Sequence, residues 1–592
     1  MAPSSSRRHP ILSVRRARLL YLCIVLIIGI FGVRVFYLQI IKHDYYRRAA
    51  MSDQLKEYYI PATRGIIKAH DGSAIVPIVL NQKLYTLYAD PTLIKNTSQV
   101  AESIAAVLGG DQSEYIEKLK TPDTRYVILQ NKLTPEQKEK ILKPKYAGIG
   151  AQERFYRTYP NGSMASQLLG FVNNESKGVY GIEQALDREL SGTPGQLKAV
   201  TDVNGIPLAA NTENTLTPAR PGDDLVLTID MAMQKQLETI LQQGLEKAKS
   251  NSGSAIIMDP NTGAIKAMAN LPTYDPANYA SVEDGNLFNN AAVSSPLEVG
   301  SIMKPLTAAA ALDLGAVRPD TTYYDPAVWE IDDYKITNIE EDGGAAHQSV
   351  SSILSLSLNT GATWLLMQMG EKGKTEITKE GRERWYSYMV DHYGFSKETG
   401  IEQGFEASGY VPDPNDGFGL DLTYANTSFG QGMTATPLQM ASAFSAIING
   451  GVYYQPRLVD YIVDGGGNKK VKQPVALRKN VVRPEVSVQM KGLLENVIAS
   501  KKYIRPSFNL AQYSVGGKTG TAEIAKPGGG YYENEFNGTY LGFVGGDKPQ
   551  YVITVRIDKP KVGGYAGTAA AQPVFVELAH MLIDDFGVTP KS

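Results

Sequence analysis

Residues 297–305 read Leu297-Glu298-Val299-Gly300-Ser301-Ile302-Met303-Lys304-Pro305. A serine stands three residues before a lysine, so a helix beginning near Ser301 would stack both side chains on one face. A hydroxyl beside a partly desolvated amine is an activated nucleophile, because desolvation lowers the pKa of a lysine and frees neutral amine to accept the hydroxyl proton. Taken alone, such a pair is by default an exposed helix start with a solvated lysine, so the rest of the chain must support the catalytic interpretation.

The composition excludes several classes of function. With 592 residues, 43% of them apolar, and a net charge of −2, the chain can bury several cores and lacks the basic footprint of a nucleic-acid binder. Its one cysteine, Cys23, excludes an intrachain disulfide and a thiolate cluster. The six histidines show no H-x-x-x-H pairing, so we expect no metal site. The chain also has no phosphate-cradling G-x-x-x-x-G-K-S/T loop, and we expect no cofactor.

An apolar run near the N-terminus predicts a membrane anchor. Residues 1–18 are polar and rich in arginine, and residues 19–41 are apolar and long enough to cross a bilayer. The arginines predict a cytoplasmic N-terminus and an extracytoplasmic body. A cleaved signal peptide is the alternative, but Ala49-Ala50 is a poor cleavage site. Arg34 fits either snorkelling to the interface or contact with another membrane protein.

The region from residue 42 to residue 221 has mixed α+β character and no cluster of titratable groups. Thr63–Ile67 and residues 84–89 are strand-like, and residues 97–108 and 135–143 have helical patterns. We interpret this region as a rigid spacer or docking domain, and Pro221-Gly222-Asp223-Asp224 marks its end by composition.

From residue 222 onward the chain predicts strands, many helices, strands again and a final helix. Strand 225–230 ends in Asp230, which suits the cap of a helix over 231–248, and a hairpin follows at 254–268. Further helices are expected at 350–370, 434–450 and 571–586, and strands at 540–544 and 551–557. The order predicts one α/β domain whose sheet unites its two ends, with a helical block inserted.

Two further stretches complete a possible active site. Ser357-Leu358-Asn359 offers a hydroxyl and an amide, and Val515–Ala522 is a glycine-flanked strand that carries Lys518-Thr519-Gly520-Thr521. Each stretch alone is a weak signal. In this chain order, after Ser301 and Lys304, they make the three-part set of the penicillin-recognising serine acyltransferases.

On these motifs the sequence resembles the class B penicillin-binding proteins, the monofunctional peptidoglycan D,D-transpeptidases, over nearly its whole length. Tyr88-Ala89-Asp90-Pro91 favours the septal, FtsI-type branch used in cell division. Two departures are the valine Val299, where the family often has proline, and Ala69-His70-Asp71-Gly72, where it usually has Asp-Arg-Asn-Gly. The resemblance also covers Arg64-Gly65-x-Ile67, Arg157-x-Tyr159-Pro160-x-Gly162, Gly181-Ile182-Glu183, Leu227-Thr228-Ile229-Asp230, Gly430-Gln431-Gly432, Thr436-Pro437-Leu438-Gln439 and Ala571-Gln572-Pro573-Val574-Phe575.

The resemblance implies an architecture. It predicts a cytoplasmic tail at 1–18, a transmembrane anchor at 19–41, a mixed α+β pedestal of the dimerisation-domain type at 42–221, and a penicillin-binding transpeptidase domain at 222–592. The last would have the fold shared with serine β-lactamases, an antiparallel sheet flanked by helices.

The resemblance also assigns roles. Ser301 would be the nucleophile, Lys304 its base, Ser357 a proton relay, and Asn359 a holder of Lys304 and of the substrate amide. Lys518 would attract the substrate carboxylate, with Thr519, Gly520 and Thr521 completing the binding strand.

The implied partners are peptidoglycan stem peptides, lipid-linked precursors, β-lactams, and an FtsW-like SEDS-type glycosyltransferase with other division proteins. Three alternatives remain: an elongation-type transpeptidase, a membrane-anchored D,D-carboxypeptidase or β-lactamase, and a non-catalytic β-lactam sensor or division scaffold. A sensor would need an internal signalling domain, and a decayed scaffold should have lost a motif residue.

Overall fold

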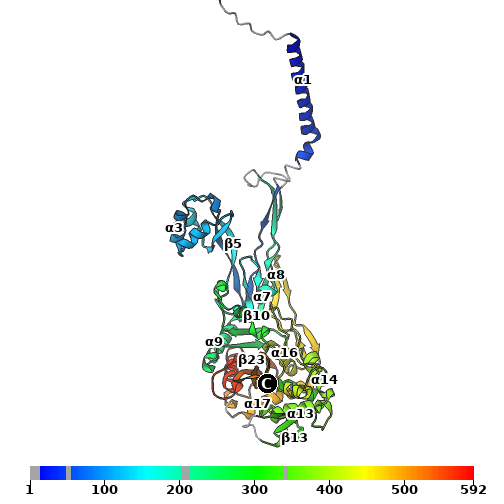
Figure 1. Ribbon diagram of the computed structural model, residues 1–592. Helices are drawn as coiled ribbons and strands as arrows, with labels where there is room; N and C mark the ends of the chain where they lie inside the picture. The colour runs from blue at the N-terminus through cyan, green and yellow to red at the C-terminus, as the bar shows by residue number, and fades with distance from the viewer. Residues whose placement is uncertain (1–13, 48–54, 202–213, 339–343, 503) are drawn as a thin grey trace, which may run out of the picture. The chain divides into compact units, whose positions relative to one another are not determined.

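The computed structural model describes residues 14–47, 55–201, 214–338, 344–502 and 504–592 (Figure 1). The chain divides into two compact units. Unit 1 comprises Met1–Ala62 and Thr193–Arg220, and unit 2 comprises Thr63–Gly192 and Pro221–Ser592. Residues 1–13 of the expected cytoplasmic tail (1–18) lie outside the described residues.

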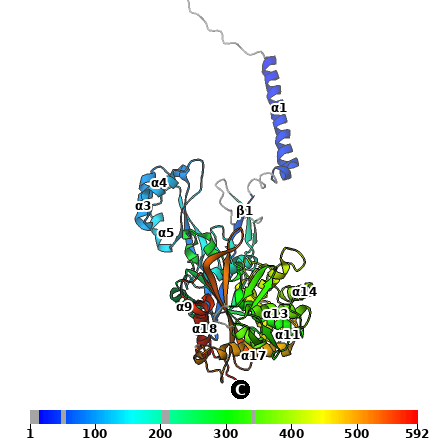
Figure 2. The ribbon, with the colours of Figure 1, turned by 60° about the horizontal axis from the view of Figure 1, so that its bottom comes forward.

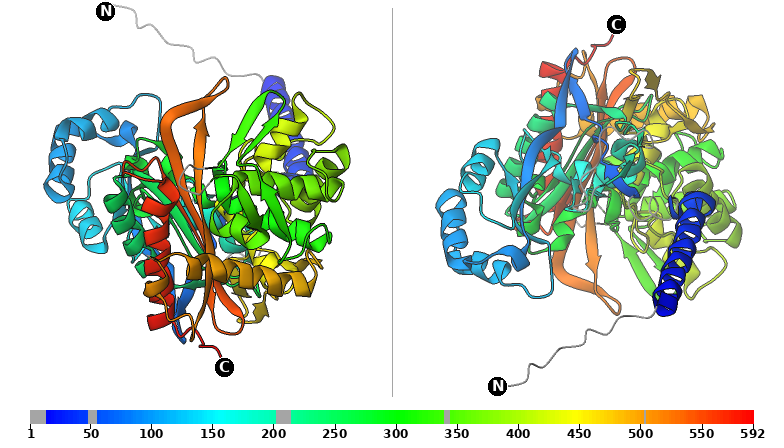
Figure 3. Two further views of the ribbon diagram at one scale, coloured as in Figure 1. Left: turned by 90° about the horizontal axis from the view of Figure 1, so that it is seen from below. Right: turned by 90° about the horizontal axis from the view of Figure 1, so that it is seen from above.

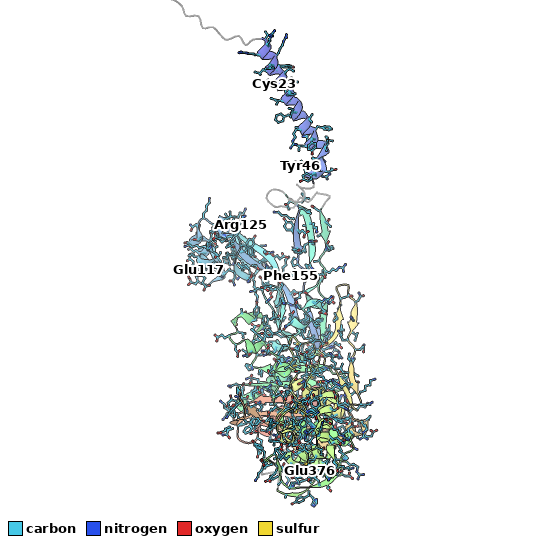
Figure 4. All side chains as sticks on the ribbon, turned by 45° about the vertical axis from the view of Figure 1, so that its right-hand side comes forward. Cys23, Tyr46, Glu117, Arg125, Phe155 and Glu376 are labelled. Carbon is cyan, nitrogen blue, oxygen red and sulfur yellow. The ribbon has the colours of Figure 1, made fainter. Side chains whose placement is uncertain are left out.

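Unit 1 contains a long apolar helix and a small sheet. Helix α1 (Val14–Phe36) continues into the π-helical turn η1 (Tyr37–Ile41), and together they are long and apolar enough to cross a membrane. The described chain buries none of these residues, and Figure 4 shows side chains such as Cys23 projecting freely from the helix. The sheet is antiparallel and consists of β1 (Leu55–Ile60), β8 (Gly195–Val200) and β9 (Thr215–Thr217).

A five-stranded antiparallel sheet forms the centre of unit 2 (Figure 3). Its order is β12-β11-β23-β22-β21, so the hairpin at the start of the domain pairs with strands from its end. The predicted sheet that unites both ends is confirmed. The strands are β11 (Ser252–Met258), β12 (Ile265–Leu271), β21 (Ser514–Ala525), β22 (Tyr531–Gly545) and β23 (Pro549–Asp558).

Two helices cover one face of this sheet, α9 (Met231–Ala248) and α18 (Gln572–Asp585) (Figure 2). Asp230 begins α9 as expected, because its carboxylate accepts the backbone N–H of Met233 at 3.0 Å. The apolar side chains of α9 recur at helical spacing and are buried against the sheet: Met233, Leu237, Leu241 and Leu245. The last helix covers the C-terminal strands, with Phe575 stacked on Tyr540 at 4.1 Å.

A helical block covers the opposite face. The turn η5 (Gly300–Met303) leads into α11 (Lys304–Asp313), so a helix does begin near the predicted serine. The predicted helical regions are confirmed as α12 (Val350–Ser355), α13 (Asn359–Gly370) and α16 (Pro437–Ile448). The block also contains α10 (Ala291–Ser294), α14 (Lys379–Ser387), α15 (Leu420–Thr427) and α17 (Pro484–Ser500).

A second sheet lies within unit 2, in the order β19-β18-β10-β2-β3-β4, with β5 also paired to β3. Strand β10 follows the compositional boundary at residue 221 but pairs in parallel with β2, which precedes it. The sheet therefore joins chain from both sides of that boundary. The bounds are β2 (Ile67–Asp71), β3 (Ala74–Ala89), β4 (Val127–Leu133), β5 (Ile149–Thr158), β10 (Asp224–Asp230), β18 (Val459–Val463) and β19 (Lys469–Val471).

The prediction of a strand over Thr63–Ile67 is wrong, because β2 begins only at Ile67. The preceding backbone runs against other segments: Gly65 N–H donates to the carbonyl of Leu190 at 2.8 Å. A Cβ atom on Gly65 would lie 1.8 Å from the carbonyl oxygen of Asp223. This close approach explains the glycine and leaves no room for regular strand pairing.

A small lobe of helices packs on the outer end of the second sheet (Figure 1). The expected helices at 97–108 and 135–143 are α3 (Thr97–Leu108) and α5 (Pro135–Leu142), and α4 (Gln112–Leu119) lies between them in sequence. Thr134 and Gln137 form a reciprocal capping box at the start of α5. The core of the lobe includes Leu87, Val100, Ile104, Leu119, Leu129 and Ile141.

A buried ion-pair network fastens the segment before β2 to β5. The carboxylate of Glu183 is fully buried and binds Arg64 Nε at 2.7 Å and Arg157 Nε at 2.8 Å. Arg157 also donates through Nη1 to Asn81 Oδ1 at 2.9 Å, and Arg64 donates to Asp187 at 2.6 Å. These contacts account for four residues of the sequence motifs by packing and charge compensation: Arg64, Gly65, Arg157 and Glu183.

Replacing Glu183 with alanine is expected to destabilise unit 2 by about 3–5 kcal/mol, because both arginines would be left buried without their anion. Urea unfolding followed by circular dichroism measures the change. The matched control is Glu153→Ala, which removes an exposed pair with Lys83 (2.9 Å) and should leave the unfolding midpoint almost unchanged. Equal losses in the two variants would contradict the role given to Glu183.

Candidate active site

A cleft of about 810 Å³ opens along the outer edge of β21. Three segments far apart in sequence form its floor: the turn η5, the junction between α12 and α13, and β21 itself. Six of the eight predicted site residues line the cleft: Ser301, Ser357, Asn359, Lys518, Thr519 and Thr521. Of the other two, Lys304 is buried beneath the cleft, and Gly520 packs closely against Thr539 of the neighbouring strand β22.

Lys304 is the first residue of α11, and its side chain is fully buried. Its Nζ donates to Asn359 Oδ1 at 2.8 Å, to Ser357 Oγ at 3.2 Å and to the carbonyl oxygen of Ser357. Ser301 precedes it by one tight 3₁₀ turn, a geometry in which side chains three residues apart lie in line. A buried amine with fixed acceptors thus lies directly behind a cleft-lining serine.

Ser357 joins two lysines. Its Oγ accepts from Lys304 Nζ at 3.2 Å and from Lys518 Nζ at 2.8 Å. Its backbone has φ of +62°, a left-handed conformation that non-glycine residues adopt at an energetic cost. A hydroxyl has two lone pairs and one hydrogen, so with both lysines as donors its hydrogen remains available to a third group.

The flanking helices impose this conformation on Ser357. Helix α12 begins with a reciprocal capping pair, Ser349 and Ser352, and its end is closed by the N–H of Leu358 donating to the carbonyl of Ile353 at 3.0 Å. Leu358 is buried, and α13 starts at the next residue, Asn359. The break between the helices therefore places the hydroxyl of Ser357 and the side-chain amide of Asn359 next to the amine of Lys304.

Glycines hold the turn that presents Ser301. Gly300 has φ of +62°, and a Cβ atom there would lie 2.6 Å from the carbonyl oxygen of Thr521. Its N–H donates to the carbonyl of Gly430 at 3.0 Å. A Cβ atom on Gly430 would in turn lie 2.2 Å from the carbonyl oxygen of Gly300. The turn that carries Ser301 is wedged between β21 and the loop after α15, with no space for side chains at either contact.

Strand β21 carries the predicted residues Lys518, Gly520 and Thr521, which make different contacts. Lys518 is almost fully buried, and its Nζ also donates to the carbonyl of Thr519 at 3.0 Å. The hydroxyl of Thr521 accepts the N–H of Gly567 at 3.0 Å and keeps its own hydrogen to donate. A Cβ atom on Gly520 would lie 2.3 Å from Thr539 Oγ1, so the strand sits tightly on the chain behind it.

Val299, which replaces the frequent proline of the resembled family, is fully buried in the core. Its φ of −89° lies near the range that a proline ring imposes, and its carbonyl accepts from Thr539 Oγ1 at 3.1 Å. Valine thus preserves the course of the turn and fills an apolar site.

Sequence reasoning missed a role for Glu298, although it stands three residues before Ser301. Its Oε1 accepts the N–H of Gly432 and the hydroxyl of Tyr531, each at 3.1 Å, and its Oε2 is buried without a partner among the described residues. Burial, with a contribution from nearby Glu523, raises the pKa of Glu298. Glu523 lines the cleft and accepts from Gln431 Nε2 at 3.3 Å.

Two family models match the chain. The one described as the penicillin-binding protein transpeptidase domain matches residues 253–580, and the one described as the penicillin-binding protein dimerisation domain matches residues 59–227. The chain belongs to the penicillin-binding protein family. It is a serine acyltransferase of the transpeptidase class.

Relatives and solved structures agree with this family. The chain is 30% identical to Stage V sporulation protein D of Bacillus subtilis, over 97% of this chain and 87% of that protein. It is 26% identical to peptidoglycan D,D-transpeptidase FtsI of Escherichia coli, over 100% of this chain and 95% of that protein. A peptidoglycan synthetase structure from Bifidobacterium adolescentis has a TM-score of 0.68 at 26% identity, covering 91% of this chain and 98% of that one.

Replacing Glu298 with glutamine should change the pH dependence of stability. Because folding raises the pKa of Glu298, its contribution to stability is complete below the ordinary pKa of a glutamate and is lost as the pH rises through the raised pKa. Glutamine keeps an acceptor for both donors and does not ionise. Urea midpoints between pH 4 and pH 8 should therefore fall less steeply with pH in the variant than in the native protein.

The matched control is Glu376→Gln, an exposed carboxylate marked in Figure 4. It should leave the pH profile of the native protein unchanged. Parallel profiles for native protein and the Glu298 variant would contradict a coupling between Glu298 and folding.

Proposed function

We propose that this protein is a peptidoglycan D,D-transpeptidase of septal wall synthesis, with Ser301 as nucleophile and Lys304 as its base. One observation carries the assignment: the amine of Lys304 is buried and held by Ser357 and Asn359 directly behind the serine. A solvated lysine at an exposed helix start, the competing interpretation of the same sequence, would have none of these contacts.

The first half-reaction transfers an acyl group to the enzyme. Ser301 Oγ attacks the carbonyl carbon of the penultimate D-alanine while Lys304 Nζ accepts the hydroxyl proton. The bond to the terminal D-alanine nitrogen then breaks, and the proton reaches that nitrogen through Ser357 Oγ, which lies 3.2 Å from Lys304 Nζ. Free D-alanine leaves and an ester on Ser301 remains.

The cleft also supplies recognition of the substrate's charges. Lys518 Nζ and the hydroxyls of Thr519 and Thr521 would bind the terminal carboxylate of the stem peptide, and all three residues line the cleft. The backbone N–H groups of Ser301 and Thr521 would stabilise the oxyanion, and removing one such donor typically costs about 3 kcal/mol of transition-state stabilisation.

The second half-reaction forms the crosslink and regenerates the free enzyme. The amine of a neighbouring stem peptide attacks the ester, forms the crosslinking amide and gives its proton back to the Ser301 oxygen through the same groups. A β-lactam follows the first step only. Its leaving nitrogen stays tethered to the acyl group after ring opening, which hinders attack by the second amine.

We further propose that helix α1 anchors the protein with its N-terminus in the cytoplasm and the catalytic domain, residues 222–592, outside the membrane. The arginine-rich segment 1–18 supports this direction. An FtsW-like SEDS-type glycosyltransferase would contact the helix around Arg34 and the pedestal, residues 42–221. Tethering keeps the enzyme at the surface where its membrane-linked substrate is assembled.

Replacing Ser301 with alanine is expected to abolish covalent labelling by a fluorescent penicillin, with the circular dichroism spectrum unchanged. Native protein should hold the label for minutes, because an efficient deacylating water would be needed to release it. Gel fluorescence after a chase with unlabelled penicillin measures both. Rapid loss of label from the native protein would support the hydrolase alternative, a carboxypeptidase or β-lactamase, and labelling of the alanine variant would exclude Ser301 as nucleophile.

A role in sporulation is the second candidate, because the Bacillus relative named for sporulation is the more similar of the two relatives described above. Septal duty predicts that a fluorescent fusion gathers at midcell in growing cells. Fluorescence confined to sporulating cells would favour the second candidate, and fluorescence along the side wall would favour the elongation-type alternative.

A further inference from the structure

A second cavity, of about 370 Å³, lies in unit 2 and shares no residue with the active-site cleft. Its walls are the ends of β4 and β5, the turn between β6 (Phe171–Val172) and β7 (Gly178–Val179), and the 3₁₀ turn η3 (Pro276–Ser281). Phe155, at its rim on β5, is marked in Figure 4. A volume of this size falls within the range of small-molecule sites.

The charges that line this cavity have one sign. Lys132, Arg154 and Arg157 contribute cations, and its lining residues include no aspartate or glutamate. Arg154 has no ion pair among the described residues. Arg157 is bound through Nε and Nη1, yet its Nη2 is buried without a partner in the described chain. Its counter-ion, the carboxylate of Glu183, is already shared with a second arginine, so the cavity favours an anion.

The remaining lining suits a sugar. Tyr279 is held flat on Phe171, with ring centroids 4.2 Å apart, and Phe155 is 44% exposed at the rim. The side-chain amide nitrogens of Asn131 and Asn173 offer donors for hydroxyl and acetamido oxygens, whereas both side-chain oxygens already accept hydrogen bonds from within the protein. Lys132 Nζ donates to the carbonyl of Ala277 at 2.7 Å and so holds the wall formed by η3 against β4.

We propose that this cavity binds a peptidoglycan glycan segment through its sugar rings and a free carboxylate of the attached stem peptide. The inference rests on the proposed function and deepens it, since it gives the enzyme a second contact with its polymeric substrate. A polymer held at a second point reaches the cleft at a raised effective concentration. The site thereby favours existing wall over free peptides as substrate.

The test uses the full chain in detergent, with Ser301 first acylated by penicillin so that the cleft is blocked. A soluble disaccharide tetrapeptide with free carboxylates is titrated by calorimetry. We expect one site on the blocked protein and at least a tenfold weaker Kd in Arg154→Gln. The matched control, Lys83→Gln, removes an exposed lysine from neighbouring β3 and should bind as native protein does.

A fragment with amidated carboxylates should bind the native protein about tenfold more weakly and lose nothing further in Arg154→Gln, because charge pairing is then already absent. No binding to the blocked protein, equal binding by Arg154→Gln, or preference for a sugar phosphate without peptide would overturn the proposal. Arg154→Gln should keep the native rate of penicillin labelling. If the fragment does not bind but penicillin still labels the protein, only the second binding site is refuted and the proposed function holds. If penicillin does not label the native protein, both proposals are refuted.

Discussion

The cleft along β21 depends on keeping one lysine amine, that of Lys304, out of water. A buried amine without acceptors is costly, so the side chain of Lys304 requires oxygen atoms at fixed positions. The chain supplies them by ending one helix, turning through Ser357 and starting the next at Asn359. The left-handed backbone of Ser357 is the local cost of that arrangement, and the burial of Leu358 between the helices offsets it.

The same constraint shapes the turn that carries Ser301. Once Lys304 is fixed, Ser301 must enter the helix through a turn pressed against β21, and only glycine fits at the contact with Thr521. Glu298, one residue before the buried valine, binds the turn to the loop at Gly432 and to the hairpin at Tyr531. The position of the serine is thus set by three separate parts of the chain.

The sequence was sufficient for features whose signal is local. Helical periodicity and caps predicted α9 and α5, the turn residues 259–263 predicted the hairpin, and the three motifs predicted six residues that line the cleft. Contacts between distant segments carried no such signal. The close contact of Gly65 with Asp223 is invisible in the local sequence, which therefore predicted a strand there. The hydrogen bond between Glu298 and Tyr531 joins residues 233 positions apart, so the local sequence gives no sign of it.

The order of strands in the central sheet has a consequence for how this protein is made. Strand β11 pairs with β23, and the contact between Ser252 and Asp558 spans 306 residues of chain. At synthesis rates of about 5–20 residues per second, the first hairpin waits roughly 15–60 s for its partner. During that interval an apolar strand edge is exposed. The cleft along β21 is therefore among the last parts of the protein to assemble during biogenesis.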